Sequence, residues 1–320
     1  MKTRTLRITV CPACLGPLRL AASEVVEDEI RAGTLTCARC GAVFLIVRGV
    51  PRFVTQLGDR QQIAESFGFQ WHVRGQGRFE TGTLYGLSED DERDGFFHAL
   101  DRGPLDLEGK TILEAGCGDG FLLRILSKLP VDIVGIDINT SIDRTADACR
   151  GFANVSVLQA DLLRAPFAPG TFDIVWSEGV IVCTADPREA FGSLASLVKP
   201  GGTLYVWVYP SERLSVYQRM RDLLVAPYRL PRPVLLYLCY LLAVPIYLLA
   251  RPYAAWQRRR GVPVDAKPSI GSVAFSLFDN LSPRYQSRHT TAEVRGWFEA
   301  FGFADVKQTG LIGMTGRKAG

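Results

Sequence analysis

The sequence predicts an α/β protein built on a doubly wound, Rossmann-like sheet of mostly parallel strands. Residues 111–120 read TILEAGCGDG, a short apolar run followed by glycines at every second position and then the amphipathic run 121–129. This succession is typical of a strand, a tight turn and a helix. A second apolar run, 133–136, ends in Asp137, and further buried strands are expected at 172–176 and 204–208.

The glycine turn predicts a ligand site. Positions without side chains let a ligand approach the backbone, and the following helix offers free N–H groups. The spacing G-C-G-D-G differs from the G-x-G-x-x-G of dinucleotide sites, and Glu114 would repel a pyrophosphate but attract a cation. Asp137 lies 21 residues after Gly116, a spacing that suits binding of the two ribose hydroxyls.

The motifs EAGCGDG, GID, QAD and VKPGG resemble the successive motifs of class I S-adenosylmethionine-dependent methyltransferases. The resemblance covers about residues 109–209 and resumes near 290. It implies a seven-stranded sheet, S-adenosylmethionine as cofactor, a ribose contact from Asp137 and an adenine contact from Asp161. The complete set of expected cofactor-binding residues is Glu114, Gly116, Cys117, Gly118, Gly120, Asp137, Ile138, Asp161, Leu162 and Ser177.

Two C-x-x-C pairs near the N-terminus predict a metal site. Cys11 and Cys14 are followed, after 22 residues, by Cys37 and Cys40. Four thiolates at this spacing can close a tetrahedral structural zinc site. The surrounding sequence resembles zinc ribbons of the methyltransferase-activator type. Reduced cysteines without metal and a redox pair are the alternatives, and scattered remaining cysteines argue against a disulfide framework.

Candidates for catalysis come from several segments. Glu178 follows the strand at 172–176, where ligands bind in doubly wound sheets, and Ser177 is expected beside the same site. Many members of the family carry paired histidines shortly after this strand, but this chain has Val182 and Cys183 there. The candidate bases are Glu178, Tyr209, His72 and His289, although His289 precedes a capped helix and could simply seat it.

The acceptor is expected to meet residues from two other segments. The aromatic stretch 66–72 precedes the core, and its Trp71 could either border the site or pack the segment onto the core. The segment near residue 285 should return to the carboxyl edge of the sheet. The expected substrate contacts are Trp71, Asp279, Tyr285 and Arg288.

An insertion of about 80 residues separates the fifth strand from the last helix. Residues 210–265 hold nine arginines, no lysine and three acids, and residues 234–250 hold no charge at all. Three interpretations remain open: a helical lid or dimer face, a membrane-surface segment over 228–260, and a membrane span. Seventeen uncharged residues with Pro245 inside are short for a span.

We therefore expect a zinc ribbon over 1–56, a linking segment over 57–108, a core over 109–209 and 286–320, and an insertion over 210–285. The first residues hold no long apolar run, so a cytoplasmic protein is predicted, with a location peripheral to the membrane as the alternative. The leading function is methyl transfer to a small-molecule or lipid-like acceptor. The alternatives are an RNA methyltransferase and a non-catalytic binding partner, and neither the oligomeric state nor the acceptor atom is predicted.

Overall fold

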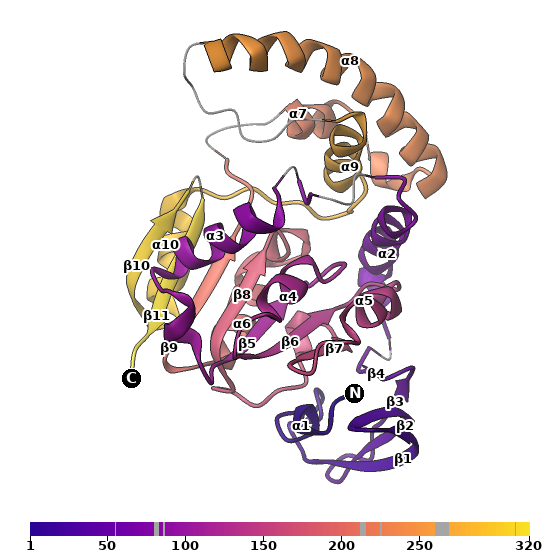
Figure 1. Cartoon of the computed structure of the whole chain (residues 1–320), viewed down its shortest axis with the longest axis vertical. Coiled ribbons are helices and arrows are strands. Elements are labelled where there is room, and N and C mark those ends of the chain that lie inside the picture. The colour runs from indigo at the N-terminus through magenta and orange to yellow at the C-terminus, as the bar shows by residue number, and fades with distance from the viewer. Residues whose placement is uncertain are drawn as a thin grey trace.

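An eleven-stranded mixed sheet runs through the molecule (Figure 1). The computed structural model describes residues 1–54, 56–79, 83–85, 87–211, 216–224, 226–259, 269–310 and 312–320. The strand order is β1-β2-β3-β4-β7-β6-β5-β8-β9-β11-β10. The last seven strands of this order form the core, and the first four belong to the N-terminal module.

The core sheet has the predicted doubly wound form. Strands β5, β6, β7, β8 and β9 are parallel, and β11 and β10 add an antiparallel hairpin beyond β9. A ligand site is expected where β5 lies between β6 and β8, because the helical connections leave the sheet on opposite sides there. The strands are β5 (Thr111–Ala115), β6 (Asp132–Asp137), β7 (Val155–Gln159), β8 (Phe172–Glu178), β9 (Val198–Trp207), β10 (Phe303–Thr309) and β11 (Gly313–Lys318).

Helices cover both faces of the core sheet (Figure 1). One face packs against α3 (Glu89–Leu100), α4 (Phe121–Leu126) and α5 (Ile142–Cys149), and the other against α6 (Pro187–Leu197) and α10 (Thr291–Ala300). Side chains cap the starts of α6 and α10. Asp186 accepts hydrogen bonds from the N–H groups of Arg188 and Glu189, and Thr290 accepts one from Glu293.

The N-terminal module continues the core sheet. It contains α1 (Thr3–Leu6), β1 (Leu18–Val26), β2 (Glu29–Cys37), β3 (Val43–Val47) and β4 (Val50–Arg52). Strand β4 pairs in parallel with β7 where Arg52 lies opposite Gln159, and the Arg52 guanidinium also lies 2.5 Å from Asp143 of α5. Leu35 and Phe44, which are buried residues of the N-terminal module, belong to the same apolar cluster as residues of the core strands. The module is therefore packed onto the core and does not hang from a linker.

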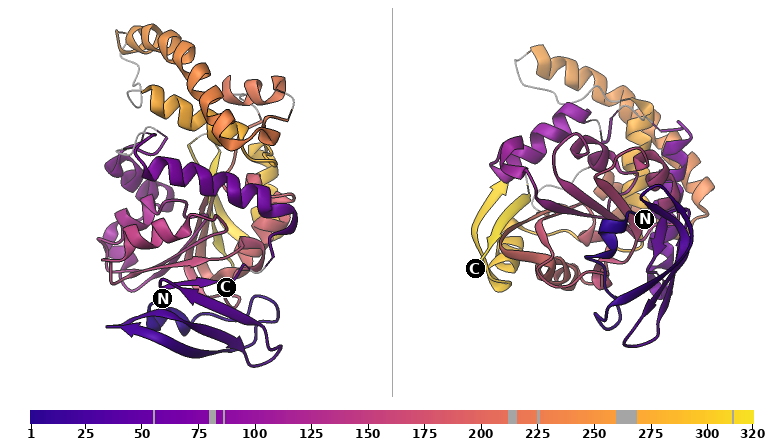
Figure 2. Two further views of the ribbon diagram at one scale, coloured as in Figure 1. Left: turned by 90° about the vertical axis from the view of Figure 1, so that its right-hand side faces the viewer. Right: turned by 60° about the horizontal axis from the view of Figure 1, so that its bottom comes forward.

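The insertion forms a helical cap at the opposite end of the core from the N-terminal module (Figures 1 and 2). It contains α7 (Val216–Leu223), the long α8 (Arg232–Arg259) and α9 (Ile270–Leu281), and it packs on α2 (Gln61–Gly75) of the linking segment. Among the described residues, one stretch, Arg232–Leu249, is long and apolar enough to cross a membrane. Short 3-10 turns complete the chain at 58–60, 104–107, 162–164, 181–183 and 227–229. The domain boundaries expected from the sequence remain a proposal.

Candidate functional site

A cavity of about 900 Å³ opens at the carboxyl ends of the parallel strands. Its walls come from the loops after β5, β6, β7 and β8, from the end of β9, and from α2, α7 and α9. The volume lies near the top of the usual range for ligand sites, roughly 300–1,000 Å³, so it can hold more than one small molecule.

The glycine turn forms the floor of the cavity. Gly116 and Gly118 have positive φ angles of 90° and 50°. A Cβ atom at Gly116 would meet Val180 at 2.2 Å, and one at Gly118 would meet the Trp71 ring at 2.7 Å. Glycine is therefore required at both positions by conformation and by space. Cys117 also lines the cavity, whereas Gly120, with φ of 77°, caps α4 without lining it.

Asp137 is held in place at the end of β6. Its two carboxylate oxygens accept hydrogen bonds from the N–H groups of Gly118 (2.9 Å) and Asn139 (2.8 Å). Each oxygen keeps a lone pair for a ligand. Burial raises the pKa of Asp137, although these two hydrogen bonds act in the opposite direction. With Ile138 beside it in the wall, this carboxylate has the geometry expected for a ribose contact.

At the end of the cavity where the adenine is expected, the structure contains a contact that the sequence did not indicate. Asp161 and Leu162 line the cavity, and Asp161 accepts a hydrogen bond from the N–H of Leu163 at 3.0 Å. The other Asp161 oxygen forms an ion pair with Arg60, which comes from the segment between the N-terminal module and α2. An adenine amino group would therefore share Asp161 with Arg60.

The opposite end of the turn is acidic. Glu114, Glu178 and Glu92 all line the cavity, and among the residues that the structure describes none of them forms an ion pair. Burial, followed by the neighbouring carboxylates, raises the pKa of Glu114 well above its usual range. Enclosure and then Glu92 raise the pKa of Glu178 to about 8. One buried oxygen of Glu114 also lacks a hydrogen-bond partner.

These residues fit a cationic ligand. A positive charge near the Glu114 oxygen would relieve the repulsion among the three carboxylates and satisfy the unpaired oxygen. The sulfonium and ammonium groups of S-adenosylmethionine are cations of this kind. Glu92 belongs to α3 and was expected only to start a solvated helix, so the sequence did not indicate its place in the cavity.

The other half of the cavity is aromatic. Trp71 lies over the glycine turn and packs against Phe275 with ring centroids 5.7 Å apart, and Tyr285 also lines this half. Tyr209 and Asp279 lie in the same wall, where the Tyr209 hydroxyl donates to Asp279 at 2.8 Å. The structure thus brings together Trp71, Asp279 and Tyr285, which are predicted substrate contacts, and Tyr209, which is a predicted base. Tyr85 was not predicted, although it lines this half and donates to the same carboxylate.

Five predicted site residues lie outside the cavity wall: Gly120, described above, and Ser177, His72, Arg288 and His289. Ser177 points into the sheet and donates to the Ala115 carbonyl at 3.1 Å, because successive strand residues face opposite sides. His72, on α2, lies 2.9 Å from the side chain of Gln76, which follows that helix. Arg288 forms an ion pair with Asp222 at 2.9 Å. His289 is buried between Glu293 and Ser287, each 2.8 Å from a ring nitrogen. It therefore seats α10, and its prediction as a base is wrong.

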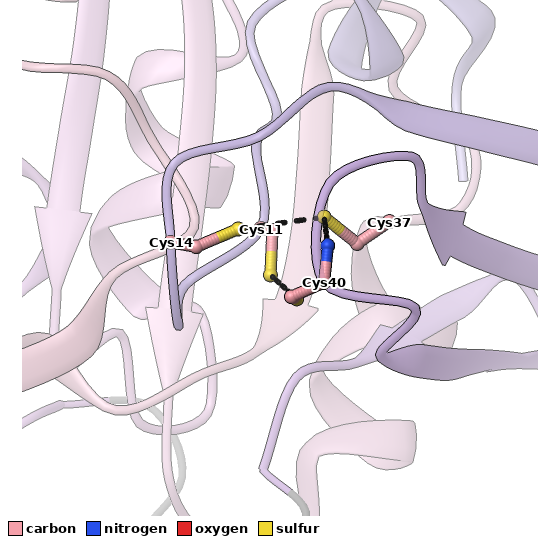
Figure 3. A group of neighbouring side chains, drawn as sticks. All are labelled: Cys11, Cys14, Cys37 and Cys40. Atoms are coloured by element: carbon pink, nitrogen blue, oxygen red, sulfur yellow. Dashed lines mark hydrogen bonds between the residues drawn. The ribbon is translucent and has the colours of Figure 1, made fainter.

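The four N-terminal cysteines form one cluster (Figure 3). Their sulfurs all lie within 4.8 Å of one another, with Cys11–Cys40 at 3.6 Å and Cys14–Cys37 at 3.5 Å. A tetrahedral zinc ion with Zn–S bonds of about 2.3 Å separates its sulfurs by about 3.8 Å. A Cβ at Gly16 would lie 2.9 Å from the Cys37 sulfur, so the knuckle has no room for a side chain there. The cluster fits zinc.

Comparison with known families agrees with both sites. Residues 113–206 match the model of a methyltransferase domain, and residues 2–49 match that of Trm112p-like proteins. The chain carries a class I methyltransferase domain behind an activator-type zinc ribbon. The predicted family and fold are thus confirmed, and S-adenosylmethionine and zinc are the cofactors that these two domains imply.

Individual relatives match part of this chain. An uncharacterized methyltransferase of Mycobacterium tuberculosis is 34% identical over 37% of this chain and 60% of its own length. A ubiquinone biosynthesis O-methyltransferase of Cupriavidus pinatubonensis is 31% identical over 32% of this chain and 43% of its own. A crystal structure of an Aquifex aeolicus S-adenosylmethionine-dependent methyltransferase is 16% identical, covering 69% of this chain and 90% of that chain with a TM-score of 0.39. The chain spans less than two thirds of the length of the two curated relatives, from Mycobacterium tuberculosis and Cupriavidus pinatubonensis.

The ribbon generates a first prediction. The purified chain should contain one zinc ion, and Cys37→Ser should lose it and lower the melting temperature, because so small a module depends on its metal. Elemental analysis and thermal unfolding measure both effects. Cys149→Ser, outside the cluster, should keep its zinc, and a wild-type chain without zinc would contradict the assignment.

Asp137→Ala should weaken S-adenosylmethionine binding at least about tenfold, because it removes a charge-assisted contact to the ribose. Isothermal titration measures the affinity. Asp132→Ala, at the opposite and exposed end of the same strand, is the matched control and should bind like the wild type. Equal affinities for the two variants would remove Asp137 from the site.

The raised pKa of Glu178 predicts a pH dependence of stability. The folded state binds this proton more tightly than the unfolded state, so stability is lost as pH rises from about 4.5 to about 8. The Glu178 side chain is open to the cavity, so solvent screens part of this effect. Glu178→Gln should therefore raise the melting temperature relative to the wild type more at pH 9 than at pH 5. The exposed Glu108→Gln should show no such difference between the two pH values.

Proposed function

We propose that this chain transfers a methyl group from S-adenosylmethionine to a small-molecule or lipid-like acceptor. The observation that carries the proposal is a single cavity with two unlike halves. One half joins the glycine turn to Asp137 and the acidic residues Glu114 and Glu178, and the other is aromatic. A charged cofactor and an apolar acceptor would thus meet within one enclosed space.

S-adenosylmethionine, when bound, supplies a methyl group already activated for transfer. The protein then has to align the acceptor with the bond that breaks, and positioning of this kind can remove roughly 7–11 kcal/mol of a barrier. Trp71 would hold the glycine turn and border the acceptor. Glu114 and Asp137 would fix the two ends of the cofactor that flank its sulfur. Glu178, at the end of β8, would border the transferred group.

An apolar acceptor is supported by the make-up of the aromatic half. The side chains of Trp207, Tyr217 and Phe67 line the cavity, and Cys183 replaces the polar pair found in many members of the family. Helices α7 and α9 close this half, so part of the insertion serves as a lid. The name of one relative, an O-methyltransferase, adds hydroxyl compounds to the candidate acceptors.

We further propose that the outer face of α8 contacts a membrane surface. Its inner face packs on α9 through Leu235, Cys239 and Ala243, and no described α8 residue lines the cavity. Arg229 and Arg232 lie at its start, where anionic headgroups would meet them, although Arg232 also pairs with Glu65 at 2.5 Å. The outer face exposes a row of apolar side chains spaced three and four residues apart: Val234, Tyr237, Leu241, Val244 and Leu248.

Transfer to RNA is a weaker alternative. It would need the ribbon and the arginine-rich insertion to form one basic surface, yet these parts lie at opposite ends of the core (Figure 2). Arg221 and Arg288 are also engaged within the protein, with carbonyl oxygens and with Asp222. Arg213 and Arg260, which contribute to the basic count, lie outside the described residues. A non-catalytic role is disfavoured because Glu114, Asp137 and Asp161 are all present in the cavity wall.

The proposal is tested by incubating the chain with methyl-labelled S-adenosylmethionine and an extract of the source cells. The products are then divided into organic, RNA and protein fractions. We expect label in the organic fraction. Label in RNA would favour the RNA alternative. No label in any fraction, with cofactor binding intact, would favour the non-catalytic one.

The membrane proposal predicts a loss of vesicle binding. Leu241 and Leu248 are 70% and 58% exposed, so glutamate at both positions should leave the fold intact. Sedimentation with anionic lipid vesicles should fall at least about tenfold, since both apolar burial and charge attraction are reduced. Leu105→Glu, at an 87% exposed leucine outside the insertion, is the control. Unchanged vesicle binding with conversion of a dimer to a monomer would make this row a dimer face.

A further inference from the structure

Asp279 lies in the aromatic half of the cavity, where the acceptor is proposed to bind, and accepts several hydrogen bonds there. It lies on α9, is only 5% exposed, and accepts three hydrogen bonds from three separate segments. Gln70 of α2 donates to one oxygen at 3.0 Å, and Tyr85 donates to the same oxygen at 2.8 Å. Tyr209, which follows β9, donates to the other oxygen at 2.8 Å. The insertion thus places a buried carboxylate in contact with the hydroxyl groups of Tyr85 and Tyr209.

These hydrogen bonds determine which polar atoms of Tyr85 and Tyr209 remain available to a ligand. Each hydroxyl uses its only proton on Asp279, so its oxygen is left as an acceptor toward the cavity. Burial, followed by the Asp279 charge, raises the pKa of Tyr209 well above its usual range. Tyr209 therefore stays protonated and can take up a proton only by passing its own to Asp279.

The charged and titratable groups around Asp279 leave its charge unbalanced. Besides the two tyrosines, the titratable neighbour is Cys183, and Arg221 in turn lies near Cys183 and Tyr209. The Arg221 guanidinium donates to the carbonyls of Asn280 and Arg284, and among the described residues no ion pair reaches Asp279. Burial raises the pKa of Asp279 although its hydrogen bonds lower it, which makes the carboxylate a better base than a solvated one.

We infer that Asp279 and Tyr209 form a proton relay for a hydroxyl acceptor, so that the reaction is O-methylation. The inference rests on the proposed methyl transfer. An acceptor hydroxyl would donate to the Tyr209 oxygen, which lies in the same wall as Trp207 and near the end of β8. Asp279 would then be a positioning and proton-accepting residue behind Tyr209.

The step balances without a further reactant. The acceptor oxygen forms a bond to the methyl carbon while the carbon–sulfur bond breaks, and that electron pair remains on sulfur. The acceptor proton moves to Tyr209 as the Tyr209 proton moves to Asp279. A sulfonium and a carboxylate are thereby converted into a thioether and a carboxylic acid, so two opposite charges disappear together. Asp279 returns its proton to water when the products leave.

The same geometry disfavours a nitrogen acceptor. An ammonium ion would pair directly with a carboxylate, but both Asp279 oxygens already accept hydrogen bonds and the group is buried. A neutral amine attacks through its lone pair and needs no base before transfer. A hydroxyl gains most from a relay, because its oxygen becomes a good nucleophile only as the proton departs.

The first test identifies the bond formed by the wild-type chain. The labelled organic product is treated with alkali, which cleaves methyl esters, and then with hydriodic acid, which releases ether methyl groups as methyl iodide. We expect label that survives alkali and is released by the acid. Label bound to nitrogen, carbon or an ester would overturn the relay and leave the proposed methyl transfer intact. No product at all would count against the proposed function itself.

The second test separates the relay from a structural role. Asp279→Asn and Tyr209→Phe should each lower kcat/KM about 100-fold or more, with S-adenosylhomocysteine affinity within about twofold of wild type. The wild-type rate should fall as pH drops through the Asp279 pKa, and Asp279→Asn should lack this acid limb. Asp147→Asn, at an exposed surface aspartate, is the control. Activity within threefold of wild type in Tyr209→Phe, or an unchanged acid limb in Asp279→Asn, would overturn the relay.

Discussion

The arrangement of the site depends on negative charge that the fold gathers and does not balance. Parallel strands bring Glu114, Asp137 and Glu178 to one edge of the sheet, and α3 adds Glu92. Burial of like charges is costly, and the raised pKa values of Glu114 and Glu178 express that cost as tightly held protons. A cationic ligand removes the cost. The fold is therefore suited to a cofactor that carries positive charge.

The insertion divides into two parts with different surroundings. Helices α7 and α9 face the cavity and contribute Gln218, Asp279 and Asn280 to its wall, whereas α8 lies on the outside of α9. Figure 1 shows α8 arching over both shorter helices as the outermost layer. Composition alone left the apolar run at 234–250 open as a lid or dimer face, a membrane-surface segment or a membrane span. The shorter, less apolar helices next to it fill the position of the lid.

The sequence predicted those parts of the site whose chemistry is local. The glycine turn, Asp137 and the four cysteines are each recognisable from spacing over a few residues, and each lies where it was expected. Glu92, Tyr85 and Arg60 reach the cavity only through the packing of separate segments, which no short pattern records. His289 illustrates the opposite error, because a rare titratable residue next to a helix start attracted a catalytic role. Its two partners satisfy both ring nitrogens within the fold.

The continuity of β4 with β7 ties the metal module to the far end of the cofactor cavity. The chain that leaves β4 reaches Arg60 within eight residues, and Arg60 holds Asp161. Arg60 thus joins the part of the chain that follows the metal module to Asp161 in the cavity wall, and linkage requires any coupling between zinc binding and cofactor binding to be mutual. A bound cofactor would then slow the loss of zinc to a chelator. A module that contributes no residue to the cavity wall would in this way be coupled to the occupation of the cavity.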